Sequence, residues 1–183
     1  TVTTIDENPY SAGCAYIKGK IVPIADACIP ITDVGFLHSD CTYDVVSVWD
    51  GSFFRLQQHL DRFEKSWQAL HLQPPLTKEE IQSVLVQLVQ ASQLRQAYVS
   101  MICTRGIASK VATRDPRLYM NQFYAFCVPY VFICDDMEQG LHLMIAKETI
   151  RIPTNAVDPT VKNFHWGDFI RGLYEAYDRG GQS

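Results

Sequence analysis

The dipeptide Asp50-Gly51 lies between two apolar segments, residues 45–49 and 52–56. A two-residue hairpin turn of the primed type requires positive φ at both central residues, and Asp-Gly adopts it with little strain. The sequence therefore predicts two antiparallel strands joined by a tight turn.

Two helices are predicted after this hairpin. Apolar residues recur at helical spacing over residues 57–71, and Pro74-Pro75 ends that helix. The second helix opens with Thr77-Lys-Glu-Glu80, which fits a capping box. Its expected buried face consists of Ile81, Val84, Leu85, Leu88 and Val89.

The other expected elements mix strands and helices. A hairpin over residues 14–24 turns near Lys18-Gly19, and a last helix covers residues 169–177 with Asp168 as its N-cap. Further strands are predicted at residues 98–104, 123–134 and 141–151. Because strands and helices do not alternate regularly, the pattern predicts an α+β fold.

Composition argues against two classes of partner. The 16 Lys and Arg residues are scattered and the net charge is −4, whereas nucleic-acid-binding proteins concentrate basic residues on one face. No apolar run approaches the roughly 20 residues that span a bilayer. We therefore expect neither nucleic acid nor a membrane as a partner.

The six cysteines contain no Cys-x-x-Cys pair, which predicts buried, reduced thiols in a cytoplasmic protein.

Lys162 is the first candidate for chemistry. It lies in a Pro-bounded turn, residues 158–168, between apolar residues and just before the last helix. Burial lowers the pKa of such a lysine because desolvation penalises the ammonium form. The neutral amine is the form that condenses with an aldehyde to a Schiff base. Taken alone, the residues favour the alternative, an exposed loop lysine in a surface salt bridge.

Two other residues pose similar choices. Arg62 lies mid-helix beside the apolar stripe, where it could grip a phosphate with two hydrogen bonds, or pair at the surface with Asp61 or Glu64. Tyr43 could line a cleft or belong to the core. The cluster His38, Asp40 and Cys41 is too short to indicate a metal site, and we expect none.

Three stretches together resemble a known family. Residues 30–51, residues 53–63, and residues 158–168 followed by 171–176 resemble the class IV (fold type IV) aminotransferases, in the order in which that family has them. This family includes the branched-chain and D-amino-acid aminotransferases, and uses pyridoxal 5'-phosphate. The chain looks most similar to the (R)-selective amine transaminases.

The resemblance implies a fold and a domain division. Residues 1–150 would form the small amino-terminal α+β domain of the D-amino-acid aminotransferase-like fold. Residues 151–183 would form a linker and the start of a large cofactor-binding domain. Because family members continue into that domain, which supplies further cofactor contacts, we expect the 183 residues alone to be inactive.

The resemblance also implies residue roles. Lys162 matches the lysine that binds the cofactor covalently and then moves the substrate proton, and Arg62 matches the arginine that binds the cofactor phosphate. In the loop at residues 105–121, Arg114 is the candidate for binding a substrate carboxylate, with Lys110 and Arg117 behind it. The residues expected to line the substrate pocket are His38, Tyr43, Val45, Tyr98, Ser100 and Trp166.

The implied activity is transfer of an amino group from an (R)-amine or amino acid to a keto acid such as pyruvate. Two alternatives within the family are a branched-chain or D-amino-acid aminotransferase and, ranked lower, a lyase acting on an aminated chorismate. An alternative of another class is a truncated, cofactor-free binding module that keeps the scaffold. By analogy with the family we expect a homodimer.

Overall fold

The computed structural model describes residues 8–110, 113–134 and 136–183. It divides the chain into two compact units. The first, here called the sheet unit, extends to Val131 and includes Val161–Asn163. The second unit comprises Phe132–Thr160 and Phe164–Ser183. The predicted domain boundary at residue 150 stays a prediction.

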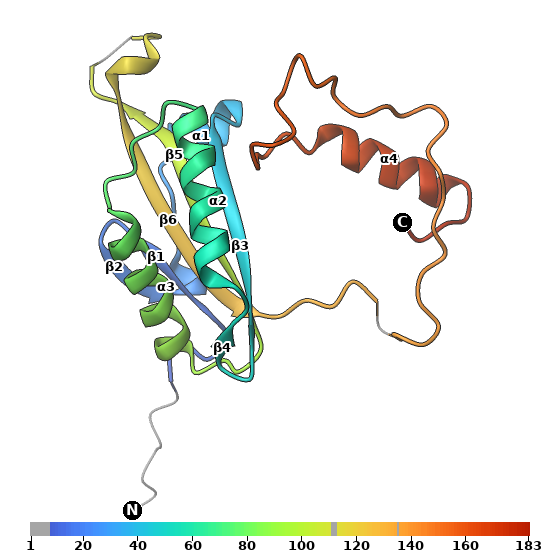
Figure 1. Ribbon diagram of the computed structural model, residues 1–183, viewed down its shortest axis with the longest axis horizontal. Helices are drawn as coiled ribbons and strands as arrows, with labels where there is room; N and C mark the ends of the chain where they lie inside the picture. Colours follow the sequence, from blue (N-terminus) through green and yellow to red (C-terminus); the bar gives the residue numbers. More distant parts are fainter. Residues whose placement is uncertain (1–7, 111–112, 135) are drawn as a thin grey trace, which may run out of the picture. The chain divides into compact units, whose positions relative to one another are not determined.

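The sheet unit is built on a six-stranded sheet in the order β2-β1-β6-β5-β3-β4, in which every neighbouring pair is antiparallel (Figure 1). Two long strands, β5 and β6, lie at its centre, and β3 pairs with β5. The strands are β1 (Cys14–Ile17), β2 (Lys20–Pro23), β3 (Cys41–Trp49), β4 (Ser52–Phe53), β5 (Ala97–Ala108) and β6 (Tyr119–Pro129).

Both predicted hairpins are present. Asp50 and Gly51 have φ values of 49° and 78°, as a primed turn requires, and Trp49 pairs with Ser52. Lys18 and Gly19 likewise have positive φ between β1 and β2. Strand β4 is shorter than predicted, because Arg55 adopts the left-handed conformation that starts the next helix.

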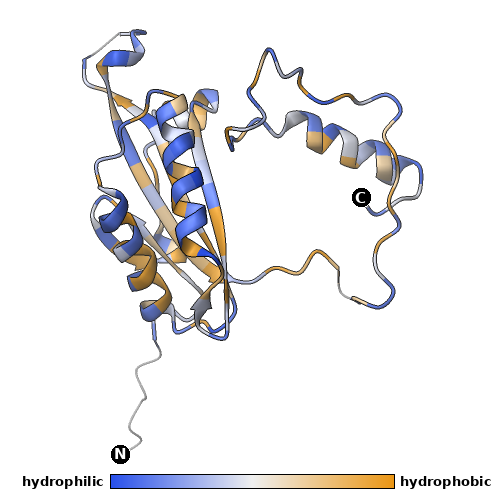
Figure 2. Ribbon diagram, viewed as in Figure 1, coloured by the Kyte–Doolittle hydropathy of each residue, from blue (hydrophilic) through white to orange (hydrophobic). Residues whose placement is uncertain are grey.

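Helices α2 (Leu56–Ala69) and α3 (Lys78–Ser92) cover one face of the sheet (Figure 1). The predicted capping box at Thr77 and Glu80 is present at the start of α3. Figure 2 shows the outer side of α2 as largely hydrophilic. The core between helices and sheet includes Leu60, Phe63, Leu85, Leu88, Val46, Val48, Val99 and Met101. The α+β class is therefore confirmed.

Three short helices complete the sheet unit: η1 (Ile24–Asp26), α1 (Val34–His38) and η2 (Pro116–Leu118). Helix α1 was not predicted, since it has five residues. Asp33 caps it by accepting a hydrogen bond from the Gly35 N–H at 2.8 Å. The same carboxylate accepts from the hydroxyls of Thr104 (2.8 Å) and Tyr124 (2.9 Å), so α1 is fixed to the sheet.

The second unit contains helix α4 (Gly167–Asp178) and corrects two predictions. The helix starts earlier than expected, with Trp166 at the N-cap position instead of Asp168. The predicted strand at residues 141–151 has no regular secondary structure. Its N–H groups at Lys147 and Thr149 donate to the Glu175 carboxylate at 2.5 and 3.0 Å, where a strand would pair with a neighbour.

Across the described ranges, no helix has the length and apolar character that crossing a bilayer demands.

Candidate active site

Lys162 lies against the edge of β3 that the sheet leaves open. Strand β5 pairs with one side of β3, and β4 pairs only with its end at Val48 and Trp49. The Lys162 carbonyl accepts hydrogen bonds from the Thr42 hydroxyl (2.6 Å) and the Tyr43 N–H (3.2 Å). Its Nζ lies 4.3 Å from the centre of the Tyr43 ring. The main chain of this lysine is thus anchored to the sheet.

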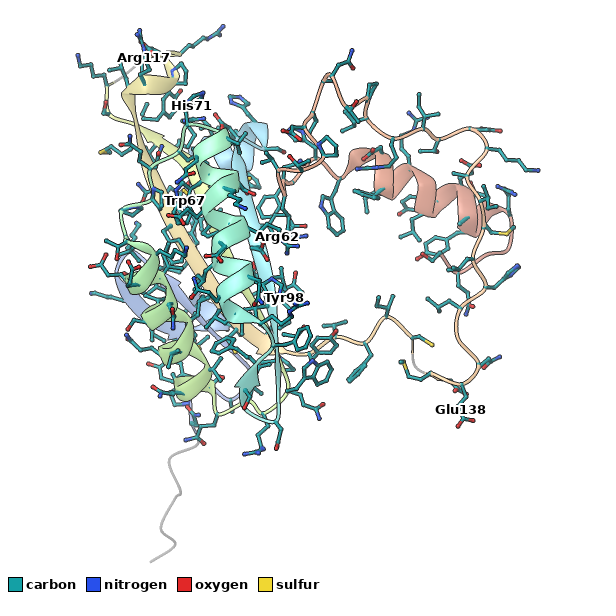
Figure 3. All side chains as sticks on the ribbon, viewed as in Figure 1. Arg62, Trp67, His71, Tyr98, Arg117 and Glu138 are labelled. Atoms are coloured by element: carbon teal, nitrogen blue, oxygen red, sulfur yellow. The ribbon has the colours of Figure 1, made fainter. Side chains whose placement is uncertain are left out.

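Arg62 projects from the middle of α2 (Figure 3) and pairs with Asp44 of β3. Its Nε donates to Asp44 Oδ2 at 2.6 Å and its Nη2 to Oδ1 at 2.8 Å. These hydrogen bonds hold the pKa of the Arg62 guanidinium above its usual value. The surface alternatives are not used, because Asp61 and Glu64 pair with Lys78.

Asp44 is a fully buried carboxylate with several donors. Besides Arg62, it accepts from the Val45 N–H at 2.7 Å, and His59 Nδ1 lies 2.8 Å from its Oδ1. Its side chain has 0% exposure, against 52% for Arg62. The arginine therefore has one end buried in a polar cluster and the rest near solvent.

Lys162 and Arg62 contact the same stretch of strand. Lys162 is bonded to residues 42 and 43, and Arg62 to residue 44. Successive side chains of a strand point to opposite faces of the sheet. Asp44 therefore points to the face that α2 covers and Tyr43 to the other face, and the Lys162 main chain is bonded to the strand edge at Thr42 and Tyr43. The Lys162 amine lies over the Tyr43 ring, and the Arg62 guanidinium is bonded to the next residue, Asp44. An amine and a guanidinium are the groups that a cofactor with an aldehyde and a phosphate requires. The donor set fits such a cofactor.

Four predicted substrate residues share the sheet face opposite α2 and α3. In the register of β3 and β5, Val45 pairs with Ser100. Two positions away on one side Tyr43 pairs with Ile102, and two positions away on the other side Tyr98 pairs with Ser47. Tyr98 stacks on Phe126 with ring centres 6.0 Å apart. Burial raises the pKa of the Tyr98 hydroxyl, and the nearby Tyr43 adds to this shift. The structure brings these four residues together.

His38 and Arg114 line a different region, a cleft of about 450 Å³ beside the far end of β5. Seven strand positions separate Tyr98 from Arg105 in the cleft wall, a distance of about 23 Å along an extended strand. The structure therefore places Arg114 with His38 and apart from Tyr98. The cleft is lined by Val34, His38, Asp40, Arg105, Arg114, Pro116 and Tyr119.

Three predicted residues remain. Lys110 is exposed, and Arg117 is hydrogen-bonded to Asp115, at the end of the β5–β6 hairpin remote from Tyr98 (Figure 3). Trp166 belongs to the second unit, where its ring contacts Phe169. Roles for these residues in substrate binding stay predictions.

Sequence reasoning missed Asp44, His59 and Arg105. Asp44 stands at an inward position of β3, on the same face as the buried Val46 and Val48, and a carboxylate there is a recognisable signal for a buried cation partner. His59 is three residues before Arg62 and so shares its helix face. Arg105 had no such signal.

Arg105, on β5, is bonded to two segments that are distant from it in sequence. Its guanidinium donates to Asp40 at 3.0 and 3.1 Å, and to the carbonyls of Leu70 (2.7 Å) and His71 (2.9 Å) after α2. It therefore connects the cleft wall to the end of the helix that carries Arg62.

Comparison with known proteins shows which family this sequence matches. A model of the family described as amino-transferase class IV matches residues 42–183. A protein of Methanocaldococcus jannaschii provisionally named branched-chain-amino-acid aminotransferase is 30% identical over 161 residues, covering 88% of this chain and 54% of that protein. The D-alanine aminotransferase of Listeria monocytogenes is 32% identical over 91 residues, 50% of this chain and 32% of that enzyme.

Solved structures show the same fold. The branched-chain aminotransferase of Thermoproteus uzoniensis, solved with norvaline, superposes with a TM-score of 0.76 at 20% identity, covering 92% of this chain and 57% of that one. The Escherichia coli branched-chain amino acid aminotransferase gives 0.77 at 18% identity, covering 93% and 58%. The chain thus spans little more than half the length of these proteins. Class IV aminotransferases use pyridoxal phosphate.

Proposed function

The chain belongs to the amino-transferase class IV family, and we propose that it forms part of a pyridoxal-phosphate-dependent transaminase with Lys162 as the residue that binds the cofactor. The observation that carries this proposal is that the Lys162 main chain and the Arg62 guanidinium are both hydrogen-bonded to residues 42–44 of β3. The two residues lie 100 positions apart in sequence, so only the fold brings them to the same strand.

Lys162 holds and moves the substrate proton in this proposal. Pyridoxal phosphate supplies an electron-accepting ring that takes up the electrons released when the substrate carbon loses its proton. The Lys162 amine accepts that proton and returns it at the cofactor side, as a general base and then a general acid. Two contacts support this role: the Lys162 main chain is anchored on Thr42 and Tyr43, and its Nζ lies 4.3 Å from the centre of the Tyr43 ring. Both restrict the positions that the amine can take, and a general base must be within hydrogen-bond reach of the proton.

Arg62 binds the cofactor phosphate in the same proposal. A guanidinium presents five N–H donors in a planar fork, and the two hydrogen bonds to Asp44 leave donors for a second anion. A guanidinium is charged at every working pH, and the hydrogen bonds to Asp44 raise the pKa of Arg62 further.

For the substrate, we propose an (R)-amine or amino acid as donor and a keto acid such as pyruvate as acceptor. The four residues on the sheet face opposite α2 and α3, Tyr43, Val45, Tyr98 and Ser100, carry no formal charge, which suits an apolar or aromatic substituent. Arg114 in the cleft with His38 is the candidate for an acceptor carboxylate. The proposed assembly is a homodimer, and the proposed location is the cytoplasm.

The second candidate is a branched-chain or D-amino-acid aminotransferase, which the names of the similar proteins favour. A donor panel of (R)-1-phenylethylamine, D-alanine and L-leucine, each with pyruvate or 2-oxoglutarate, separates the two. Faster turnover of the phenylethylamine supports the first candidate, and turnover of only an amino acid supports the second.

Replacing Lys162 tests the reaction itself. We expect Lys162→Ala in the full-length protein to abolish the borohydride-reducible adduct with pyridoxal phosphate and to lower turnover by roughly 10²–10⁴-fold or more, because the base is lost with the attachment point. Lys65→Ala on the exposed side of α2 is the matched control and is expected to behave as the unchanged protein. Normal turnover in Lys162→Ala, or no adduct in the unchanged protein, contradicts the proposal. The second result favours a cofactor-free binding module.

A further inference from the structure

We propose that Asp44 is a positioning residue that sets the affinity of the site for a phosphate group, by holding Arg62 side-on. This inference rests on the proposed function, because it assigns Asp44 a task in cofactor binding. The contacts of Asp44 within the fold are what single it out.

The hydrogen bonds are divided between two edges of the guanidinium. Asp44 occupies the side edge, with Nε on Oδ2 and Nη2 on Oδ1. The end edge is formed by Nη1 and Nη2, and Nη2 also lies 3.4 Å from His59 Nδ1. This edge can bind a second anion with two parallel hydrogen bonds. Side-on and end-on binding do not compete, because they use different N–H groups.

Asp44 is itself rigid enough to serve as an anchor. It has no exposed surface, and its Oδ1 also contacts the Val45 N–H and His59 Nδ1. A buried carboxylate is destabilising unless it is paired and hydrogen-bonded, and Asp44 meets both conditions. Because Asp44 is held within β3, its two hydrogen bonds hold the Arg62 guanidinium in one orientation.

Arg62 needs such an anchor because half of its side chain is exposed. A free arginine side chain loses rotamer entropy when it is fixed by a ligand, and this loss weakens binding. Fixing it beforehand removes much of that cost from binding. An opposite effect also exists, since the negative charge of Asp44 repels a phosphate. We infer that orientation outweighs repulsion, and the two effects predict opposite outcomes for Asp44→Asn.

The test compares two ligands that differ only in the phosphate. Affinities of the full-length protein for pyridoxal phosphate and for pyridoxal are measured by titration of the bound-cofactor absorbance, with inorganic phosphate as a competitor. For Asp44→Asn we expect affinity for pyridoxal phosphate to fall by about tenfold, because the ligand must then fix the Arg62 side chain itself. Affinity for pyridoxal should not change, because it has no phosphate to orient.

A double-substitution cycle shows whether Asp44 acts through Arg62. In an Arg62→Ala background, adding Asp44→Asn should cause no further loss of preference for pyridoxal phosphate over pyridoxal. Asp50→Asn is the matched control, since Asp50 is an exposed carboxylate that also pairs with an arginine, Arg95. It should leave both affinities unchanged.

Several outcomes overturn the inference. Unchanged or tighter binding of pyridoxal phosphate in Asp44→Asn shows that orientation does not dominate, and an equal loss for both ligands shows a general structural role. If Asp44→Asn does not fold, His59→Gln removes the imidazole contact of Asp44 and keeps the charge of Asp44. We expect a loss of preference of about two- to threefold, smaller than for Asp44→Asn because Asp44 keeps its other contacts. No loss overturns the proposal. Failure of the proposed function looks different: the unchanged protein then shows no preference for pyridoxal phosphate.

Discussion

Asp33 is a fully buried carboxylate held by uncharged donors. It accepts hydrogen bonds from the Gly35 N–H and from the hydroxyls of Thr104 and Tyr124. Burial, followed by the hydrogen bond to Asp33, raises the pKa of the Tyr124 hydroxyl well above its usual range, so this phenol remains a donor. The three contacts fix α1, and with it His38, the last residue of that helix.

We expect Asp33→Ala to destabilise the protein by about 3 kcal/mol. Three donors lose their acceptor, and a buried donor without a partner costs about 1–3 kcal/mol. Urea denaturation followed by circular dichroism measures the change. Asp26→Ala, at an exposed position of η1, is the control. Equal midpoints for the two variants would show that the Asp33 contacts contribute nothing net.

Among the elements, β5 contains an irregularity that depends on one glycine. The register with β6 shifts between Thr104 and Ile107, and Gly106 has a φ of +82° within this interval. A Cβ on Gly106 would lie 1.9 Å from the carbonyl oxygen of Met120. The close approach of the two strands therefore admits no side chain. The irregularity precedes the loop that carries Arg114.

Gly106→Ala is expected to destabilise the sheet by more than about 2 kcal/mol, with about 1 kcal/mol or more from the backbone conformation and the rest from the clash. Gly51→Ala separates the two causes. Gly51 has a φ of +78°, and a Cβ added there would meet no atom within 4 Å beyond its chain neighbours, so only the conformational cost applies. Chemical denaturation of both variants checks this, and equal losses would mean that the clash is relieved by a strand shift.

How much of the fold the sequence could predict depended on how local each signal was. The hairpin at Asp50-Gly51 and the capping box at Thr77 are set by neighbouring residues, and both were confirmed. The segment 141–151 alternates apolar residues like a strand, but a strand also needs a partner, and its N–H groups bind Glu175 instead. The pairing of Asp44 with Arg62 requires α2 to dock on β3, which no local pattern reports.

For the whole molecule, cofactor binding and stability are linked. A ligand that binds only the folded protein stabilises it by RT ln(1 + [L]/Kd), about 2.7 kcal/mol when the ligand is at about 100 times its Kd. The proposed site joins β3, α2 and Val161–Asn163, so the ligand would stabilise the sheet unit as a whole.

Pyridoxal phosphate is therefore expected to raise the melting temperature by several degrees, and pyridoxal at the same concentration by less, since it lacks the phosphate. A thermal-shift assay with and without each ligand checks this. The difference between the two ligands should vanish in Arg62→Ala and persist in Arg95→Ala, an exposed arginine that pairs with Asp50. A shift of equal size for both ligands in the unchanged protein would show that no group of this molecule binds the phosphate.

The hydrogen bond between Thr42 and Lys162 joins residues 120 positions apart. A ribosome adds about 5–20 residues per second, so roughly 6–24 s pass between the synthesis of the two. Throughout that interval the outer edge of β3 still awaits the segment that will cover it, and an unpaired edge is where growing chains associate wrongly. The arrival of Lys162 therefore both delivers the amine of the proposed site and covers the edge of β3 at residues 42 and 43.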